Sequence, residues 1–304
     1  MKEDKKVLIV VVGPTAVGKT DFCVKLAQEL KTEVVYADSR QFFKEMQIGT
    51  ARPTEEEMQD VPHHFVGHLS INQEYSFGHY EKDTLALLED LFQKHQTVIL
   101  SGGSGMYVDA VCKGIDPMPT SQPEIRNKLN QQFKDEGIQP LLDQLKIKDP
   151  EYYEVVDRAN TQRVIRALEV IEITGKTYTS QRNKASVQRP FDIITIGLDR
   201  DRQELYDRIN FRMELMLKNG LVEEVERLKE YKTHNALQTV GYKEIFDFWD
   251  QKHDWKETVE LLKRNSRRYA KKQLSWFRRN PDTHWAHPDQ LKEVIKYLNE
   301  KINQ

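Results

Sequence analysis

The chain has 304 residues, of which 38% are hydrophobic and 31% are charged, enough for a buried core in one large or two ordinary domains. Its net charge is −2, and its only two cysteines, Cys23 and Cys112, are too few for a disulfide framework or a structural zinc site. No run of about 18 apolar residues exists, and the charged residues 1–6 precede no apolar signal region. We therefore expect a folded, soluble and cytoplasmic protein with both cysteines reduced.

The first part of the chain alternates between short apolar runs and amphipathic segments. Apolar runs such as Val7–Val12 are typical of strands buried on both faces, and Thr20–Leu30 repeats its apolar residues at helical spacing. This alternation predicts a parallel sheet with right-handed crossovers, whose ligand crevice lies at the carboxyl ends of the strands. The expected elements, in chain order, are strand Val7–Val12, helix Thr20–Leu30, strand Val34–Ala37, helix Tyr80–His95 and strand Thr97–Ser101.

The composition changes after Gly114, where several prolines are followed by polar, glutamine-rich sequence with helical spacing. This sequence predicts a mostly helical insertion domain over residues 117–190. Core-like patterns then return, so the core domain is expected to be discontinuous, with residues 1–116 and 191–304 joined in one α/β fold. The later elements expected are strand Ile193–Leu198, helix Gln203–Asn219 and helix Leu221–Tyr231.

A phosphate-binding loop follows the first expected strand. The segment fits the pattern G-x-x-x-x-G-K-[ST], with a strand before it and a helix after it. In such a loop the backbone N–H groups and the helix N-terminus bind phosphate, Lys19 reaches the outer phosphate, and the Thr20 hydroxyl can hold Mg²⁺. The sequence therefore predicts a P-loop NTPase-like parallel sheet flanked by helices, but it leaves open whether a phosphate group is transferred, anchored or released. The loop consists of Gly13, Pro14, Thr15, Ala16, Val17, Gly18, Lys19 and Thr20.

A second candidate site residue, Asp38, follows the second expected strand and lies beside the phosphate loop. In a parallel sheet, the carboxyl end of a strand is where catalytic and ligand-binding groups stand. The Asp38 carboxylate could bind Mg²⁺, accept a proton from a nucleophile, or cap the following turn. Position alone does not choose between these roles.

Charge is distributed unevenly along the chain. Residues 261–280 contain eight Lys or Arg and no acidic residue, although the whole chain is nearly neutral. Five of these cations recur at helical spacing, which predicts a positive stripe on one helix face, interleaved with aromatic side chains. Such a stripe is typical of a nucleic-acid-binding surface, and the alternative is a solvated helix face. The cations are Arg264, Arg267, Arg268, Lys271 and Arg278, and the aromatic residues are Tyr269, Trp276 and Phe277.

These motifs occur in the order typical of one enzyme family. Over nearly its full length the sequence resembles the tRNA dimethylallyltransferases, also called tRNA isopentenyltransferases. It has no cysteine after Cys112, so it resembles the compact bacterial form rather than eukaryotic members with a C-terminal zinc finger. Beyond the phosphate loop, the matching segments are Asp38–Gln41, Ile48–Pro53, Val61–His64, Gly102–Tyr107, Gln162–Arg166, Arg208 with Arg212, Gln238–Tyr242, Arg268–Gln273 and Trp276–Arg278.

The resemblance implies a reaction. Family members transfer a dimethylallyl group from dimethylallyl diphosphate to N6 of the adenine immediately 3′ of the anticodon, at tRNA position 37, and release diphosphate. It implies Asp38 as the general base, with Thr15 and Ser104 as further catalytic residues. It also implies Arg212 as a diphosphate ligand facing the loop, and Mg²⁺ held by Thr20 as the cofactor.

The resemblance also implies which parts bind RNA. The insertion domain is expected to contact the anticodon loop, and the positive stripe is expected to help hold the anticodon stem-loop while the target base leaves its stack. The expected partners are tRNA and dimethylallyl diphosphate, and the protein is expected to act as a monomer away from membranes. The implied RNA-binding residues are Asp38, Ser39, Arg40, Gln41, Ser104, Gln162, Arg163, Val164, Ile165, Arg166, Arg264, Arg268, Lys271 and Arg278.

Three other functions share part of this pattern. A P-loop small-molecule kinase would have the same sheet, loop and Mg²⁺ but would transfer a phosphoryl group. An enzyme that prenylates free adenine nucleotides would need neither the insertion nor the basic helix, and a non-catalytic RNA-binding module would not depend on Asp38. The roles of single residues also have other interpretations. Arg208 and Arg212 could form surface ion pairs, and Ser104 could be a turn residue bonded to its own backbone.

Overall fold

The chain forms two compact units in a computed structural model that describes residues 5–182 and 187–303. Unit 1 consists of Met1–Lys113 and Gln188–Gln304, and unit 2 consists of Gly114–Val187. The expected insertion, residues 117–190, starts and ends slightly later in the sequence. Within the two described ranges, no helix is both long and apolar enough to cross a membrane.

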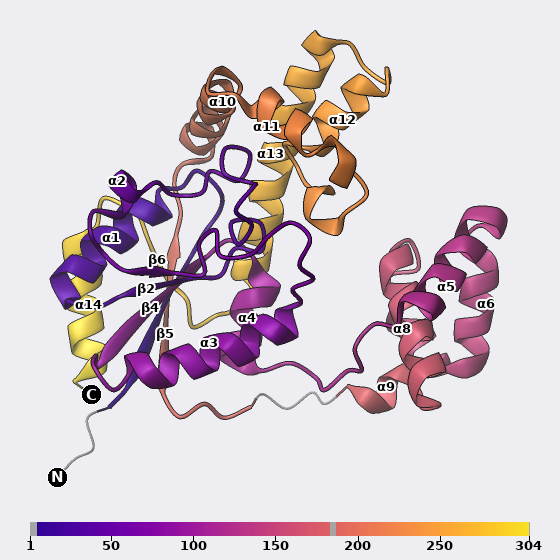
Figure 1. Cartoon of the computed structure of the whole chain (residues 1–304). Helices are drawn as coiled ribbons and strands as arrows, with labels where there is room; N and C mark the ends of the chain where they lie inside the picture. The colour runs from indigo at the N-terminus through magenta and orange to yellow at the C-terminus, as the bar shows by residue number, and fades with distance from the viewer. Residues whose placement is uncertain (1–4, 183–186, 304) are drawn as a thin grey trace. The chain divides into compact units, whose positions relative to one another are not determined.

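Unit 1 is built on a six-stranded sheet in which every pairing is parallel (Figure 1). The strand order is β3-β2-β4-β1-β5-β6. Strand β1 lies between β4 and β5, with Val10 opposite Leu100 and Thr195, and all six of its residues are buried. The strands are β1 Val7–Val12, β2 Val34–Tyr36, β3 His63–His64, β4 Thr97–Gly102, β5 Asp192–Leu198 and β6 His284–Ala286.

Helices cover both faces of this sheet (Figure 1). The expected α/β fold with helices flanking a parallel sheet is therefore confirmed. The helices of unit 1 are α1 Lys19–Leu30, α2 Glu55–Met58, α3 Phe77–Leu91, α4 Gly105–Lys113, α10 Arg202–Lys218, α11 Leu221–Arg227, α12 Lys243–Trp249, α13 Trp255–Phe277 and α14 Leu291–Ile302, with short 3-10 turns at Lys229–Tyr231 and Asn235–Leu237.

The side chains of β1 alternate between two hydrophobic cores because successive residues of a strand point to opposite faces. Val10 and Val12 pack in the core that contains α3 and α4. Ile9 and Val11 pack in the core that contains α1 and α14. Burial on both sides explains why β1 is apolar without interruption.

The sequence predicts the four inner strands but misses β3 and β6 at the two edges. Neither strand contains an apolar run, because β3 is His63–His64, β6 is His-Trp-Ala at His284–Ala286, and both are only half-buried. The prediction for β5 is half right, because Asp192 and Ile193 are exposed while the end of the strand is buried. The reason is that β6 pairs only with Ile196–Leu198, so the first half of β5 lacks that cover.

Unit 2 is a bundle of helices around its own small core. Leucines from α5 and α6 pack against one face of α8, as Leu129, Leu141 and Leu168 show. The apolar residues of α8 recur at three and four positions, which gives the helix one buried face. The helices are α5 Pro123–Glu136, α6 Gln139–Lys148, α7 Pro150–Val155, α8 Thr161–Thr174 and α9 Tyr178–Gln181.

A buried carboxylate joins the start of α5 to α8 in unit 2. Glu169 is fully buried and accepts hydrogen bonds from Arg126 Nη1 at 3.1 Å, Arg166 Nη1 at 2.9 Å, the Ser121 hydroxyl and the Gln122 N–H. Burial by itself would raise the pKa of Glu169, but the hydrogen bonds from Ser121, Arg166 and Arg126 together lower it. The carboxylate is therefore charged and fully partnered.

We expect the Glu169→Ala substitution to destabilise unit 2 by about 2–3 kcal/mol, because two arginines would lose their buried acceptor. Hydrogen exchange of the α5 and α8 amides measures this loss. Because the pKa of Glu169 is lowered on folding, its contribution is present above the ordinary carboxyl pKa of about 4.3 and disappears as the pH falls below that value. Glu172→Ala removes only a half-exposed pair with Lys148 at 3.6 Å and is the control. Equal losses in the two variants would contradict the assignment.

Candidate active site

A cavity of about 620 Å³ opens at the carboxyl ends of the central strands of unit 1. The phosphate loop after β1, the Asp38 segment after β2 and the Gly102–Gly103 turn after β4 line one side. Helices α10 and α13 and the loop at Gly49–Ala51 line the rest. Several segments far apart in the sequence therefore meet where a parallel sheet is expected to bind its ligand.

The phosphate loop curls back on itself through residues with positive φ, which are glycines and one alanine. Ala16 has φ 65° and Gly18 has φ 109°, so both adopt left-handed backbone conformations. The Lys19 ammonium donates to the carbonyls of Gly13 at 3.0 Å and Pro14 at 2.8 Å. Burial lowers the pKa of Lys19 to about 8, with Arg212 adding to the effect and Asp38 opposing it. Lys19 is thus a partly buried cation held by two carbonyls of the loop.

Two arginines of α10 point at the same loop. Arg208 Nε donates to the Ala16 carbonyl at 2.9 Å, and the Arg212 guanidinium donates to the Thr15 hydroxyl. Burial lowers the pKa of Arg212 to about 10, partly offset by Asp38. Neither arginine forms an ion pair with another described residue, so the surface ion-pair interpretation is wrong for this structure.

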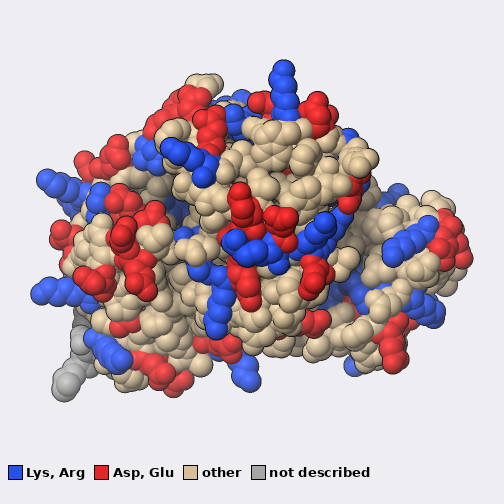
Figure 2. All heavy atoms as spheres, turned by 45° about the horizontal axis from the view of Figure 1, so that its top comes forward, with Lys and Arg blue, Asp and Glu red and all other residues tan. Residues whose placement is uncertain are grey.

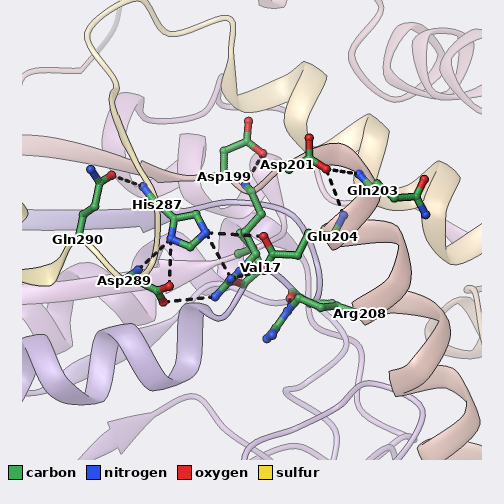
Figure 3. A network of polar contacts seen from close by, with 11 residues as sticks. Val17, Asp199, Asp201, Gln203, Glu204, Arg208, His287, Asp289 and Gln290 are labelled. Carbon is green, nitrogen blue, oxygen red and sulfur yellow. Dashed lines mark hydrogen bonds and ion pairs between the residues drawn. The ribbon is translucent and has the colours of Figure 1, made fainter.

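A third arginine supports the loop from the segment after β5. Arg200 Nε donates to the Val17 carbonyl at 2.8 Å, and its guanidinium also binds Glu204 and approaches His287 Nε2 at 3.3 Å. Figure 3 shows His287 set between Glu204 and Asp289, beside the Val17 segment. No sequence motif pointed to this network, because its members come from the phosphate loop, the segment after β5, helix α10 and the segment before α14.

Asp38 follows β2, and its two carboxylate oxygens have different neighbours. Its Oδ1 accepts from the Arg40 N–H at 3.1 Å, which is a turn cap. A Cβ atom placed on Gly103 would lie 3.6 Å from its Oδ2, so that oxygen faces the turn after β4. Burial raises the pKa of Asp38, while the backbone hydrogen bond and Lys19 oppose the rise. One oxygen is thus a cap, and the other accepts no hydrogen bond from another described residue.

The residues after Asp38 link the cavity walls to each other. The Ser104 hydroxyl accepts from the Ser39 N–H at 3.1 Å, so Ser104 bonds across the sheet rather than to its own backbone. Gln41 Nε2 donates to the carbonyls of Thr50 and Ala51 at 3.0 and 3.1 Å. These contacts fix the Asp38 segment against β4 and against the loop at Gly49–Ala51.

Arg40 is a cation at the cavity wall. Burial lowers the pKa of its guanidinium, with Tyr107 and Tyr269 nearby. It forms no ion pair with another residue in the described ranges. A partly buried cation of this kind favours an anionic ligand.

A buried carboxylate that the sequence did not reveal holds the loop that closes the cavity. Glu224 of α11 accepts from three successive backbone N–H groups, those of Gln47 at 2.9 Å, Ile48 at 2.7 Å and Gly49 at 2.9 Å. The Tyr242 hydroxyl donates to it as well, at 2.7 Å. Such a set of donors satisfies a buried charge completely and fixes the loop.

The far half of the cavity is apolar. On α10, the cations Arg208 and Arg212 face the phosphate loop, and one turn further on Met216 and Leu215 continue the same wall. Phe211 of this wall is 62% exposed, unusual for a side chain of its size. The cavity therefore has a cationic end and an apolar end.

Helix α13 carries the predicted positive stripe, but only part of it is free. Arg264, Arg268 and Lys271 are exposed and form no ion pair among the described residues. Arg267 donates to Asn210 Oδ1 at 2.5 Å, and Arg278 pairs with Asp199 at 2.6 Å. On the face turned forward in Figure 2, basic and acidic side chains are intermixed.

Two aromatic residues of the predicted stripe have structural contacts instead. Phe277 is buried in the core, and Trp276 Nε1 donates to Asp109 Oδ2 at 2.9 Å. Tyr269 alone of the three lines the cavity. The sequence pattern could not tell which of the three aromatic residues packs in the core and which lines the cavity, because all three are aromatic residues on one helix.

The RNA-binding residues expected in unit 2 need correction. Val164 and Ile165 are fully buried in the core of that unit, so the prediction that their side chains contact RNA is wrong. Arg166 donates to Glu169 and to the Pro119 carbonyl, and Gln162 Oε1 accepts from Arg126. Only Arg163 of this segment is an exposed cation with its side chain unbonded within the described residues.

The fold and the cavity define a P-loop protein in which a phosphate loop, a buried carboxylate and an apolar wall share one cavity. A family model described as IPP transferase matches residues 41–280, more than half of the chain.

Relatives cover almost all of the chain. A protein of Bacteroides fragilis named tRNA dimethylallyltransferase 1 is 49% identical, over 98% of this chain and 99% of its own. The solved full-length tRNA isopentenylpyrophosphate transferase of Bacillus halodurans is 34% identical, with a TM-score of 0.73 over 98% of this chain and 97% of its own. A eukaryotic dimethylallyltransferase solved acting on tRNA is 26% identical, with a TM-score of 0.75 over 89% of this chain and 69% of its own.

The chain therefore belongs to the tRNA dimethylallyltransferase family, a family of transferases.

We expect diphosphate binding to depend on the charge of Lys19. Its pKa is lowered to about 8, so the free side chain loses its proton as the pH rises through that value, whereas a bound anion favours the ammonium. Inorganic diphosphate should therefore bind more weakly above this pH and with uptake of a proton, measured by calorimetry in two buffers of different ionisation enthalpy. Lys19→Arg stays charged and controls for titration of the ligand. Equal proton uptake by both proteins would rule out this role.

Proposed function

We propose that this protein transfers a dimethylallyl group from dimethylallyl diphosphate to N6 of the adenine next to the anticodon, tRNA position 37. The observation that carries the proposal is that Asp38, the phosphate loop and apolar side chains of α10 border one cavity. The donor is an anion joined to an apolar chain, so it needs both kinds of wall. Membership of the tRNA dimethylallyltransferase family supports the assignment.

The reaction exchanges two bonds at one carbon. The bond from C1 of the donor to the diphosphate oxygen breaks, and its electron pair leaves with diphosphate. The bond from N6 of adenine to C1 forms, and the N6 proton passes to Asp38. Burial raises the pKa of Asp38, which makes this carboxylate a stronger base than an exposed one.

The cationic end of the cavity suits the leaving group. Backbone N–H groups of the loop Gly13–Thr20, with Lys19 and Arg212, would bind the charge that develops on diphosphate, and Thr15 is oriented for this by Arg212. The Thr20 hydroxyl lines the cavity and is 3.5 Å from the Tyr36 hydroxyl, so its oxygen can still accept a further ligand. That fits Mg²⁺, which uses few protein oxygens beside substrate phosphates and would neutralise diphosphate charge.

The apolar end of the cavity suits the five-carbon chain. Met216 and Leu215 lie about one helical turn beyond Arg212, and a turn rises about 5.4 Å, comparable to the length of a dimethylallyl group. An arginine that binds diphosphate would thus leave the chain against these side chains.

The exposed cations of α13 suit the RNA. Arg264, Arg268 and Lys271 would bind phosphates of the anticodon stem-loop, with Arg278 able to join if its pair with Asp199 opens. The segment Asp38–Gln41, with Ser104, would meet the target nucleotide at the cavity. We propose that unit 2 contacts the anticodon loop through exposed residues such as Arg163, and that the enzyme acts as a monomer in the cytoplasm.

We expect Asp38→Asn to lower kcat by about 10²–10⁴-fold and to leave tRNA affinity nearly unchanged, because the amide cannot accept the proton. The assay combines protein, dimethylallyl diphosphate, Mg²⁺ and unmodified tRNA, and detects prenylated adenosine by mass spectrometry. Asp21→Asn is the matched control, since Asp21 also lines the cavity but pairs with Lys25 at the surface. Full activity of the Asp38 variant, or phosphoryl transfer from ATP without prenylation, would refute the proposal.

We expect Arg264→Ala combined with Lys271→Ala to weaken tRNA binding and to reduce the slope of log Kd against log salt by about 1–2, since each lost phosphate contact removes about 0.7–0.9. Filter binding at several salt concentrations measures the slope. The control is Lys292→Ala with Lys296→Ala, which removes two exposed cations from α14. A slope that is the same in both double variants would place the RNA elsewhere.

A further inference from the structure

A buried amide joins two loops of the cavity that neither motif nor family resemblance connects. Gln273 lies on α13 and is 5% exposed. Its Oε1 accepts from the Thr15 N–H at 2.8 Å, and its Nε2 donates to the Gly103 carbonyl at 2.9 Å. One side chain therefore bonds to the phosphate loop after β1 and to the turn after β4.

The turn after β4 is shaped for this contact. A Cβ atom on Gly103 would lie 2.4 Å from Gln273 Nε2, closer than such atoms approach in proteins, so a glycine is needed for the amide to reach the main chain. The same Cβ atom would lie 3.6 Å from Asp38 Oδ2. Gly103 thus borders both the amide and the carboxylate.

Thr15 is held from two sides as a result. Its hydroxyl accepts from Arg212 of α10, and its backbone N–H donates to Gln273 of α13. An amide side chain offers a donor and an acceptor together without charge at any pH, as a bridge from an N–H to a carbonyl requires. Because the site is buried, losing the amide would also leave both backbone groups unpaired.

We propose that Gln273 is a positioning residue that sets the spacing between the phosphate loop and the Asp38 carboxylate. The inference rests on the proposed function, in which the loop binds the leaving diphosphate and Asp38 accepts the N6 proton. The spacing matters because both groups must act on one substrate pair in the same step. A displacement of about 1 Å can cost about 100-fold in rate.

The first test compares Gln273→Leu with Asn265→Leu. Asn265 is a second amide of α13, bonded through Nδ2 to Glu244 Oε1 at 2.7 Å, and it does not line the cavity. We expect Gln273→Leu to lower kcat by about 100-fold while the donor KM changes by less than about threefold, because Lys19 and Arg212 still bind diphosphate. Asn265→Leu should keep kcat near the wild-type value. Equal kcat in the two variants would overturn the inference.

The second test uses pH and does not depend on how well Gln273→Leu folds. In Gln273→Glu, a neutral carboxyl can accept from Thr15 and donate to Gly103 as the amide does, whereas a carboxylate can only accept. Burial favours the neutral form, so the ratio of variant to wild-type kcat should rise as the pH falls from about 8 to about 6. A flat ratio would mean that the donor to Gly103 has no part in catalysis and would also overturn the inference.

The wild-type assay separates this inference from the function on which it rests. If the wild-type protein does not prenylate tRNA, the proposed function fails and the inference fails with it. If the wild type is active but the Gln273 variants follow Asn265→Leu, the inference alone is wrong.

Discussion

A phosphate loop that offers its N–H groups to an anion cannot use them for its own secondary structure, and this constraint shapes unit 1. The carbonyls and one N–H of the loop are instead bound by side chains, one from the loop itself and the others from elsewhere in the chain. Arg200, Arg208 and Lys19 donate to its carbonyls, Arg212 donates to a hydroxyl, and Gln273 accepts from an N–H. The loop is therefore shaped before any ligand arrives, as a site that stabilises a leaving group requires.

The side chains around the phosphate loop also concentrate positive charge in a partly buried cavity. Lys19, Arg40 and Arg212 are all buried enough for their pKa values to be lowered, and Asp38 is the carboxylate that most directly counters Lys19 and Arg212. The cavity lining has four cations, Lys19, Arg40, Arg208 and Arg212, and three acids, Asp21, Asp38 and Glu57, of which Asp21 pairs with Lys25, so positive charge is in excess. An anion such as diphosphate would restore the balance, and the cost of burying these cations thus favours binding of that class of ligand.

Helix α13 serves two purposes on its two faces. Its outer face presents Arg264, Arg268 and Lys271, and its inner face presents Gln273 to the catalytic loops. The helix can do both because residues three and four apart share a face while intervening residues point away. Packing also places residues of the predicted stripe in different surroundings, since Phe277 is buried in the core whereas the three cations are exposed.

The α/β class, the phosphate loop and the position of Asp38 could be predicted from the sequence, because each depends on neighbours within one strand, turn or helix. The supporting residues could not be found in this way. Glu224, Arg200 and Gln273 act on main-chain groups far from them in the chain, and nothing in the local spacing marks such a partner. These contacts arise from the three-dimensional fold, since a hydrogen bond depends on distance in space, and packing places Val164 inside a core rather than on a surface.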